Sequence, residues 1–414
     1  MQQVIPSWLR AGAFGTALLL VATPSSSVRA DIITDWNQAA IAALVQAKLP
    51  SGAPTRALAV MHAAMFEAVN SIEPRYAPYG ASLSAPNGAS AIAAASAAAY
   101  RVLADVLLGQ SAALEARHKA LTANLAESPE KAAGVAVGER AAAAVLAARA
   151  TDGADYATEY APRTGTSMYA LTSSSAMASP LLGKMKPFVL AKSDQFRPPP
   201  PPAHDSAQHM RDLEEVKALG QKASATRTRA QTDIAQFHVP PGFLVWNSIA
   251  RAAVQAKALD LTSSARAMAL LNFATMDGQI SIWDTKYNYH FWRPRTAINA
   301  GGAPVKVATA GAAALWEPLL PEPMHPEYPC AHCGIGAAAA TVLEGLFGPG
   351  PFHFAVSTGM LGGAIRPYSS FREFEEEEAI SRIYGGVHFR WSNSVGEFVG
   401  KQVGKTVLRS LAAK

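Results

Sequence analysis

The sequence predicts an all-α protein built as a helical bundle, and two observations support this prediction. Half of the 414 residues are hydrophobic, whereas only 16% are charged and 8% are aromatic. Much of the hydrophobic content is alanine, in stretches such as residues 93–99 and 337–340. Alanine is the strongest helix former and is too small to fill a sheet-packed core. The hydrophobicity excludes a disordered chain, and only two cysteines exclude a disulfide-rich scaffold.

The first 30 residues have the layout of a secretory signal peptide. Arg10 precedes an apolar run over residues 11–22, and Val28-Arg29-Ala30 is a small-x-small cleavage pattern. The apolar run is shorter than the roughly 20 residues that span a bilayer. Cleavage after Ala30 would lower the formal net charge from +5 to +3, too little to indicate nucleic-acid binding. We therefore predict a periplasmic or secreted protein, with no membrane span in the mature chain and no nucleic-acid partner.

Helical stretches separated by short breaks occupy the first part of the mature chain. They cover residues 35–48, 54–69, 89–108, 112–125 and 129–150. Residues 151–195 are rich in Thr, Ser, Gly and Met without a clear period, which predicts a long connection with room for a short strand. Five consecutive prolines, 198–202, then predict a stiff, extended crossover.

Helices resume after the prolines. They are predicted over residues 206–219, 226–237, 243–258, 263–289 and 335–347, and from about residue 370 to the Gly385-Gly386 pair. The prolines give the best boundary between an N-terminal helical region, 31–195, and a C-terminal helical region, 196–414. Because helix content is alike on both sides, one continuous domain is an equal alternative.

Residues that can carry chemistry gather in three segments of the C-terminal third. The first holds Lys286 and Arg293, which are about two helical turns apart and can share one face of a helix. Pro294 would end that helix. The residues between the two cations are mostly aromatic, namely Tyr287, Tyr289, Phe291 and Trp292. Such surroundings indicate a partly buried site.

The second segment is Cys330-Ala331-His332-Cys333, which follows a proline-rich lead-in and precedes a helical run. His332 would lie in the first helical turn, where free N–H groups and the positive end of the dipole favour an anion. In an exported protein, Cys330 and Cys333 are expected to form a disulfide or a redox pair.

The third segment combines Arg382 with His388. The Gly385-Gly386 pair is expected to break the helix and to turn His388 towards the same pocket as Arg382. The acidic run at residues 373–378 lies near the start of this helix, complements its dipole and predicts a solvated face.

In order, the three segments read Lys-x6-Arg-Pro, Pro-x-x-His and Ser-Arg-x5-His. This combination resembles the signature shared by the vanadium-dependent haloperoxidases and the phosphatidic acid phosphatase type 2 superfamily. Phe196-Arg197-Pro198, Trp246-Asn247 and residues 283–286 look like the soluble, exported haloperoxidase-like branch. The resemblance covers most of the mature chain and implies a helical bundle of the haloperoxidase and acid phosphatase type.

The resemblance also implies a role for each matching residue in an oxyanion pocket. Lys286, Arg293 and Arg382 would surround a bound vanadate or phosphate. Each guanidinium group can donate two parallel hydrogen bonds to two oxygens of such an anion. Backbone N–H groups of Ala331 and His332 would hold further oxygens. His388 would bind vanadium axially in a haloperoxidase or attack phosphorus in a phosphatase, and His332 would be the acid–base.

Two positions depart from the family pattern. The family usually has Ser-Gly-His where this chain has Cys330-Ala331-His332, and a thiol is a weaker donor to the oxyanion and a target of peroxide. The family often places an aspartate four residues after the last histidine, where this chain has Ser392. Ser392, or Asn393 beside it, can orient His388 but supplies no charge, which disfavours phosphatase chemistry more than vanadate binding.

Three functions follow from these patterns. The first is a vanadium-dependent haloperoxidase that binds vanadate and oxidises a halide with hydrogen peroxide. The second is an exported acid phosphatase that needs no cofactor and hydrolyses a phosphoester through a phosphohistidine. The third is a thiol–disulfide oxidoreductase, because Cys330-Ala331-His332-Cys333 resembles the active-site tetrapeptide of the periplasmic enzymes. The proline-rich lead-in lacks the βαβ context of that third fold.

Overall fold

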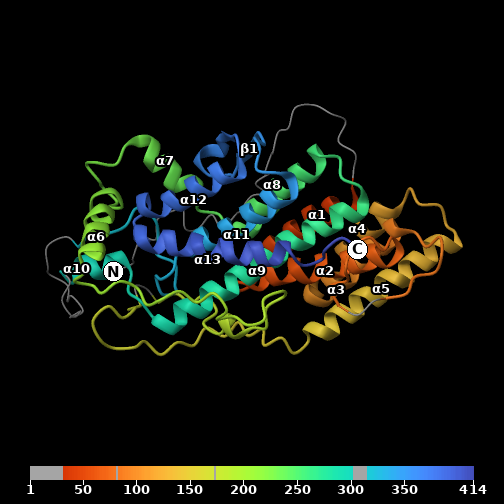
Figure 1. The fold of residues 1–414 in the computed structure, drawn as a ribbon, viewed down its shortest axis with the longest axis horizontal. Helices are drawn as coiled ribbons and strands as arrows, with labels where there is room; N and C mark the ends of the chain where they lie inside the picture. The colour runs from red at the N-terminus through yellow and green to blue at the C-terminus, as the bar shows by residue number, and fades with distance from the viewer. Residues whose placement is uncertain (1–30, 81–82, 172–173, 302–314) are drawn as a thin grey trace, which may run out of the picture.

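Helix α9 (Leu261–Tyr289) is the central element of the computed structural model, and it packs against α2, α8, α11 and α13 (Figure 1). The structure describes residues 31–80, 83–171, 174–301 and 315–414. The predicted signal peptide, residues 1–30, lies outside the described residues. The described chain is all-α apart from one small hairpin, as the sequence predicts.

The other α-helices follow in chain order. They are α1 (Ile32–Ala47), α2 (Ala53–Ile72), α3 (Ala91–Val106), α4 (Ser111–Thr122), α5 (Pro129–Arg149), α6 (Ala207–Leu219), α7 (Arg229–Phe237), α8 (Gly242–Ala256), α10 (Pro294–Asn299), α11 (Ala331–Phe347), α12 (Phe371–Tyr384) and α13 (Arg390–Leu408). Strands β1 (Phe354–Ser357) and β2 (Ile365–Tyr368) pair antiparallel, with Phe354 opposite Tyr368. Short 3₁₀ turns occur at Leu108–Gln110, Leu182–Lys184 and Leu361–Gly363.

Side-chain caps determine where most of these helices begin. An oxygen on the residue before the helix accepts a hydrogen bond from an N–H of the first turn, which has no acceptor within the helix. The residues that cap in this way are Asp31, Ser90, Ser128, Ser206, Thr228, Asp260 and Ser370. Each lies within a few residues of a helix start predicted from the sequence.

Helices α2, α3 and α5 pack together at one end of the molecule, and α6, α7 and α10 lie at the other end (Figure 1). One hydrophobic cluster extends from Ile32 in α1 to Val407 in α13. Side chains from both sides of the proline segment therefore pack into the same core. No helix among the described residues is long and apolar enough to cross a membrane.

Two features differ from the prediction. Among the described residues of 151–195, the only extended pairing is an isolated bridge between Met168 and Phe291, and the hairpin lies instead at residues 354–368. Helices α10 and α13 were not predicted. In α13, Gly396, Gly400 and Gly404 lower the intrinsic helix propensity. The structure explains these glycines, because all three lie against α11.

Replacing Gly400 with alanine is expected to destabilise the fold by about 1–3 kcal/mol, because an overpacked contact costs more than the helix propensity that alanine adds. A Cβ atom there would lie 2.1 Å from the carbonyl oxygen of Gly334 in α11. The free energy of unfolding, measured by denaturant titration, tests this. Gly109→Ala is the control, since no atom lies within 4 Å of its added Cβ. Equal effects of the two substitutions would contradict the close approach of α11 and α13.

Candidate functional site

The three predicted segments converge near the start of α11. Lys286 lies in the last turn of α9, Arg293 precedes α10, and His332 lies in the first turn of α11. Arg382 lies in the last turn of α12, and His388 lies in the connection from α12 to α13. Both arginines, Lys286 and His388 are buried, whereas His332 is partly exposed.

The ammonium group of Lys286 holds the loop that leads into α11. Its Nζ donates to the carbonyl oxygens of Pro326 at 2.9 Å, Glu327 at 2.7 Å and Pro329 at 2.5 Å. Burial, and then the nearby Arg293, lower the pKa of Lys286. Three carbonyl acceptors nevertheless match the three N–H groups of the charged form. Lys286 is therefore a buried cation that also fixes the backbone beside it.

The guanidinium of Arg293 joins two loops that are distant in sequence. It donates to the carbonyl oxygen of His325 from Nε and one terminal nitrogen, at 3.1 and 2.9 Å, and to the carbonyl oxygen of Val387 at 2.7 Å. The same group lies 3.4 Å from Nε2 of His388. Arg293 therefore places a positive charge directly beside the predicted axial histidine.

Glu327 is the site residue that the sequence analysis missed. Its Oε1 lies 2.7 Å from Nδ1 of His388 and accepts the backbone N–H of Phe389 at 3.2 Å. Burial raises the pKa of Glu327 to about 7, while burial and then Arg293 lower the pKa of His388. The sequence suggested Ser392 and Asn393 as uncharged groups that could orient His388, whereas in the structure a carboxylate from a different loop does so. Its sequence signal was a lone carboxylate within the proline-rich lead-in.

Arg382 is held by Ser381 in the last turn of α12 and by His238 at the end of α7. Its Nε lies 3.0 Å from Oγ of Ser381, and one terminal nitrogen donates to the carbonyl oxygen of His238 at 2.8 Å. Burial lowers the pKa of Arg382 to about 10. Its other terminal nitrogen, Nη1, has no hydrogen bond to any described residue. Arg382 is thus positioned while keeping donors for a ligand.

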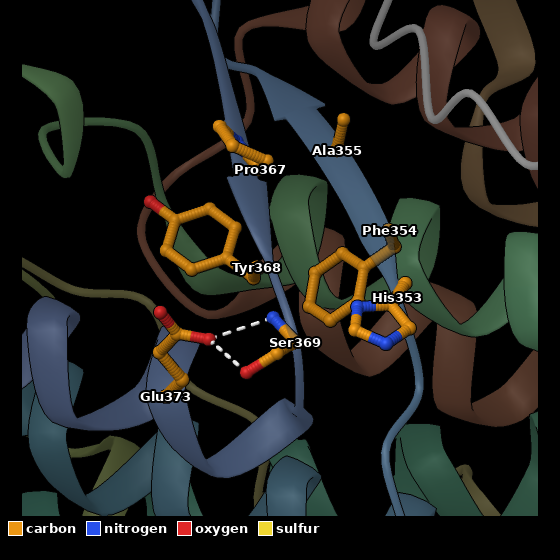
Figure 2. A pocket seen from close by; sticks show the side chains of 7 residues that line it. All are labelled: His353, Phe354, Ala355, Pro367, Tyr368, Ser369 and Glu373. Atoms are coloured by element: carbon orange, nitrogen blue, oxygen red, sulfur yellow. Dashed lines mark hydrogen bonds between the residues drawn. The ribbon is translucent and has the colours of Figure 1, made fainter.

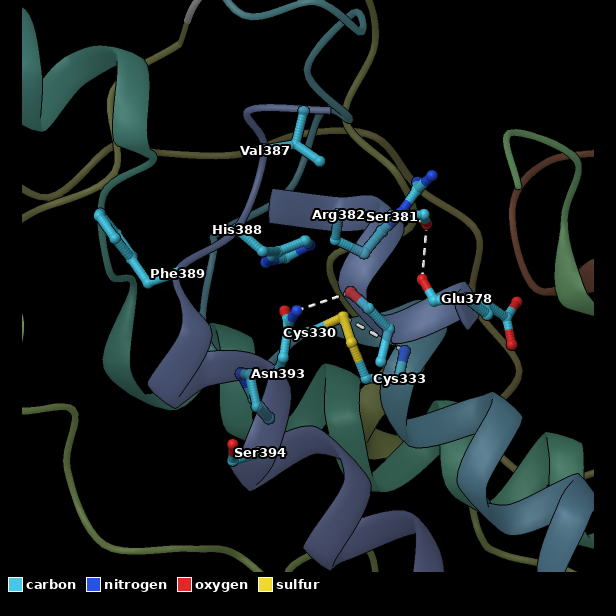
Figure 3. The surroundings of a disulfide bond; sticks show 12 residues. Cys330, Cys333, Glu378, Ser381, Arg382, Val387, His388, Phe389, Asn393 and Ser394 are labelled. Atoms are coloured by element: carbon cyan, nitrogen blue, oxygen red, sulfur yellow. Dashed lines mark hydrogen bonds between the residues drawn. A yellow bond between two sulfur atoms is a disulfide. The ribbon is translucent and has the colours of Figure 1, made fainter. Parts of the chain in front are cut away.

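Cys330 and Cys333 form a disulfide at the start of α11 (Figure 3). Sγ of Cys330 accepts the backbone N–H of Cys333 at 3.2 Å. As half of a disulfide, Cys330 has no S–H group, so the donor role predicted for this side chain is wrong in the oxidised form. The backbone N–H groups of Ala331 and His332 have no acceptor among the described residues. Nε2 of His332 is also buried without a partner.

The cluster is therefore rich in donors and positive charge. Three buried cations lie around two histidines, and the free N–H groups at the start of α11 add the positive end of a helix dipole. These cations and N–H donors are the groups that bind the oxygens of a tetrahedral oxyanion. Within the described residues, no group of carboxylates, histidines and cysteines could hold a metal cation.

The acidic run of α12 is partly buried, which corrects the prediction of a solvated face. Glu375 and Glu378 point into the protein, and burial raises their pKa values to about 7 and about 8. Oε2 of Glu378 accepts the indole N–H of Trp246 at 3.1 Å. A Cβ at Gly336 would lie 2.3 Å from the same oxygen, so the glycine leaves room for this carboxyl group.

Glu378→Gln is expected to change how stability depends on pH. Because its folded-state pKa is raised to about 8, protonated Glu378 favours the folded state, and this contribution is lost as the pH rises from about 4.5 to 8. Glutamine imitates the protonated form. The variant should match the parent at pH 4 and exceed its stability by about 2–4 kcal/mol at pH 8.

Thermal and denaturant unfolding at several pH values test this difference. Glu376→Gln is the matched control, since Glu376 is exposed on the same helix and should leave the pH dependence unchanged. A pH-independent difference between the parent and Glu378→Gln would show that folding does not raise the pKa of Glu378.

Two surface cavities lie apart from the cluster. One, of about 420 Å³, lies beside the β1–β2 hairpin, where Ser369 donates to Glu373 at its rim (Figure 2). The other, of about 260 Å³, is lined by Pro200, Pro201 and Tyr289 among others. None of the predicted site residues lines either cavity, so the predicted chemistry does not coincide with them.

Comparison with known proteins gives matches to vanadium haloperoxidases. The family model described as the VCPO second helical-bundle domain matches residues 266–413, which include all three segments. Vanadium chloroperoxidase of Curvularia inaequalis is 24% identical over 279 residues, 51% of this chain and 46% of that protein. The chain thus spans about half the length of this curated relative.

Solved structures show the same fold over most of the chain. A bacterial vanadium-dependent iodoperoxidase superimposes with a TM-score of 0.79 and 23% identity, covering 94% of this chain and 99% of the other. The holo form of a bacterial vanadium-dependent chloroperoxidase gives a TM-score of 0.68 and 18% identity, covering 86% and 90%. The described helices therefore have the helical-bundle fold of these proteins.

Proposed function

Because the chain belongs to the vanadium haloperoxidase superfamily, we propose that it binds vanadate and uses hydrogen peroxide to oxidise a halide. The observation that carries this proposal is the buried His388–Glu327 pair beside the guanidinium of Arg293. An imidazole held by a carboxylate on one nitrogen presents the other to a metal centre. Exposed, mobile side chains would not fix that orientation.

The residues present fit vanadate. Nε2 of His388 would bind vanadium, and Arg293, Arg382 and the N–H groups of Ala331 and His332 would hold its oxygens. Lys286 would act through its charge, because its three N–H groups already donate to carbonyl oxygens. Bound vanadate would supply a Lewis acid that activates peroxide for attack by halide.

Glu327 sets the proton on His388. Oε1 accepts from Nδ1 at 2.7 Å, so the ring proton stays on Nδ1 and the lone pair stays on Nε2. The ionised carboxylate also raises the basicity of the ring. Burial among cations opposes protonation of Nε2, since burial and Arg293 lower the pKa of His388. Both effects keep Nε2 available as a ligand.

His332 is placed to move protons at a bound oxygen. Its Nε2 is buried and has no partner among the described residues, and burial followed by Arg382 lowers its pKa. A neutral imidazole accepts a proton from a bound oxygen and later returns it.

The test is an assay of purified protein with vanadate, hydrogen peroxide and either bromide or iodide, in which halogenation of an organic acceptor is followed by absorbance. We expect halogenation that requires vanadate and saturates with it. Omission of vanadate and a His388→Ala variant are the controls. Hydrolysis of a phosphate monoester without vanadate-dependent halogenation would overturn the proposal in favour of the phosphatase.

We also infer that the protein is exported, from the signal-peptide layout of residues 1–30 and the cysteine pair, since disulfides persist in oxidising compartments. N-terminal sequencing of the protein recovered from outside the cytoplasm should begin at Asp31. A mature chain that retains Met1 would contradict export by this route.

A further inference from the structure

The disulfide at the start of α11 has no role in halide oxidation as proposed above. Both of its cysteines are completely buried, and they pack against Ala379 of α12. The backbone N–H of Cys330 donates to the carbonyl oxygen of Ser392 in α13. Figure 3 shows Arg382 and His388 in its surroundings, so the disulfide borders the proposed oxyanion pocket.

We propose that Cys330 and Cys333 are a dithiol pair that reduces hydrogen peroxide and closes to the disulfide seen in the structure. This inference rests on the proposed function in one respect, which is that hydrogen peroxide enters the pocket. The dithiol of the newly folded chain would consume one peroxide as it closes, and peroxide in the pocket would then keep the pair in the disulfide form.

The geometry assigns Cys330 as the attacking sulfur. Its Sγ lies over the first turn of the 17-residue helix α11 and accepts the N–H of Cys333 at 3.2 Å. A hydrogen bond and the positive end of a helix dipole both stabilise a thiolate, which is the nucleophilic form. Cys333 lies within the helix and is the resolving cysteine, because it is the disulfide partner of Cys330.

Complete burial decides which oxidant can react. Thiol–disulfide exchange with a protein requires direct contact between the sulfurs, and neither cysteine has exposed surface. This burial argues against the oxidoreductase alternative. Hydrogen peroxide is little larger than water and can hydrogen-bond to polar atoms that lack partners. Asn393 Oδ1 is such an atom among the described residues, and Asn393 is buried on α13 beside the disulfide (Figure 3).

The reaction balances without a further reactant. The thiolate of Cys330 attacks one peroxide oxygen, the O–O bond breaks, and the departing hydroxide takes a proton to become water. Cys330 is thereby oxidised by two electrons to a sulfenic acid. Cys333 then attacks that sulfur, the S–S bond forms and the S–O bond breaks. The second hydroxide leaves as water with the proton of Cys333, so two thiols and one peroxide give one disulfide and two waters.

The first experiment reduces the full-length protein with a phosphine in denaturant, where the disulfide is accessible, and refolds it after the reductant is removed. One equivalent of hydrogen peroxide is then added without vanadate or halide. Thiol titration and intact mass are then followed. We expect both thiols to disappear, with a mass loss of two hydrogens and no added oxygen. Thiols that persist, or oxygen added without loss of hydrogen, would overturn the proposal. Circular dichroism before reduction and after refolding checks that the helices have formed again.

The second experiment needs no reductant and compares Cys333→Ala with Cys330→Ala. With hydrogen peroxide alone, intact mass should show one oxygen added to Cys330 in the first variant about tenfold faster than to Cys333 in the second, because a helix N-terminus stabilises the thiolate of Cys330. Equal rates of oxygen addition would overturn the assignment of Cys330. Because both experiments omit vanadate and halide, their outcome is independent of whether the haloperoxidase assay succeeds.

Discussion

Glu327→Gln is expected to lower vanadate-dependent halide oxidation, and the affinity for vanadate, by about 10- to 100-fold, the usual effect of removing the partner of a metal-bound histidine. Glutamine has nearly the same shape but supplies no negative charge. It can also present its amide N–H to Nδ1 and so move the ring proton to Nε2, where it blocks the lone pair. Vanadate titration followed by halogenation rate measures both effects.

Two further variants make this result specific. Glu375→Gln removes a second buried carboxylate, one that pairs with Arg372, and should leave the vanadate affinity unchanged. Adding Ser392→Asp to Glu327→Gln returns a carboxylate to the position where the family often has one, and should recover part of the loss. Equal losses in the two glutamine variants would mean that Glu327 contributes only to stability.

Lys286→Met is expected to lower the free energy of unfolding by about 3–5 kcal/mol. Methionine has a similar length but leaves three buried carbonyl oxygens without a donor, and each such oxygen costs about 1–3 kcal/mol. The loop that leads into α11 should loosen first. Denaturant unfolding gives the free energy, and hydrogen exchange of the 325–333 amides locates the change.

Lys401→Met is the matched control for this substitution. Its Nζ lies 3.5 Å from a carboxylate oxygen of Glu397 on the helix surface, and such pairs contribute less than about 1 kcal/mol. The prediction fails if Lys286→Met unfolds at the same denaturant concentration as this control while its vanadate affinity falls. Lys286 would then contribute to vanadate binding and not to the stability of the loop.

The helices were predictable because alanine periodicity and capping residues are local signals. Helix α13 was missed because its glycines, which allow α11 to approach, read locally as helix breakers. The burial of Glu375 and Glu378 was also missed. Both fall on the face of α12 that includes Phe371, Phe374 and Arg382, a three- and four-residue spacing that marks the inner side of the helix.

The motifs of the candidate site could be predicted from the sequence, but the contacts between side chains from different segments could not. Spacing within each segment predicted Arg293, Arg382 and His388 as candidates, because each motif is short and continuous. The contact between Glu327 and His388 joins residues 61 positions apart. It depends on how α11 and α12 pack, which no local pattern specifies.

The buried carbonyl partners of Lys286 and Arg293 have a consequence for ionic strength. Mobile ions screen exposed charges within about 8–10 Å at physiological salt but reach buried charges poorly. Backbone dipoles that hold these cations are fixed in place and do not exchange with dissolved anions. The attraction of the pocket for an oxyanion should therefore persist at halide concentrations that would cancel the field of surface lysines. The halide oxidation proposed above requires a charged pocket of this kind, because the halide is itself a dissolved ion.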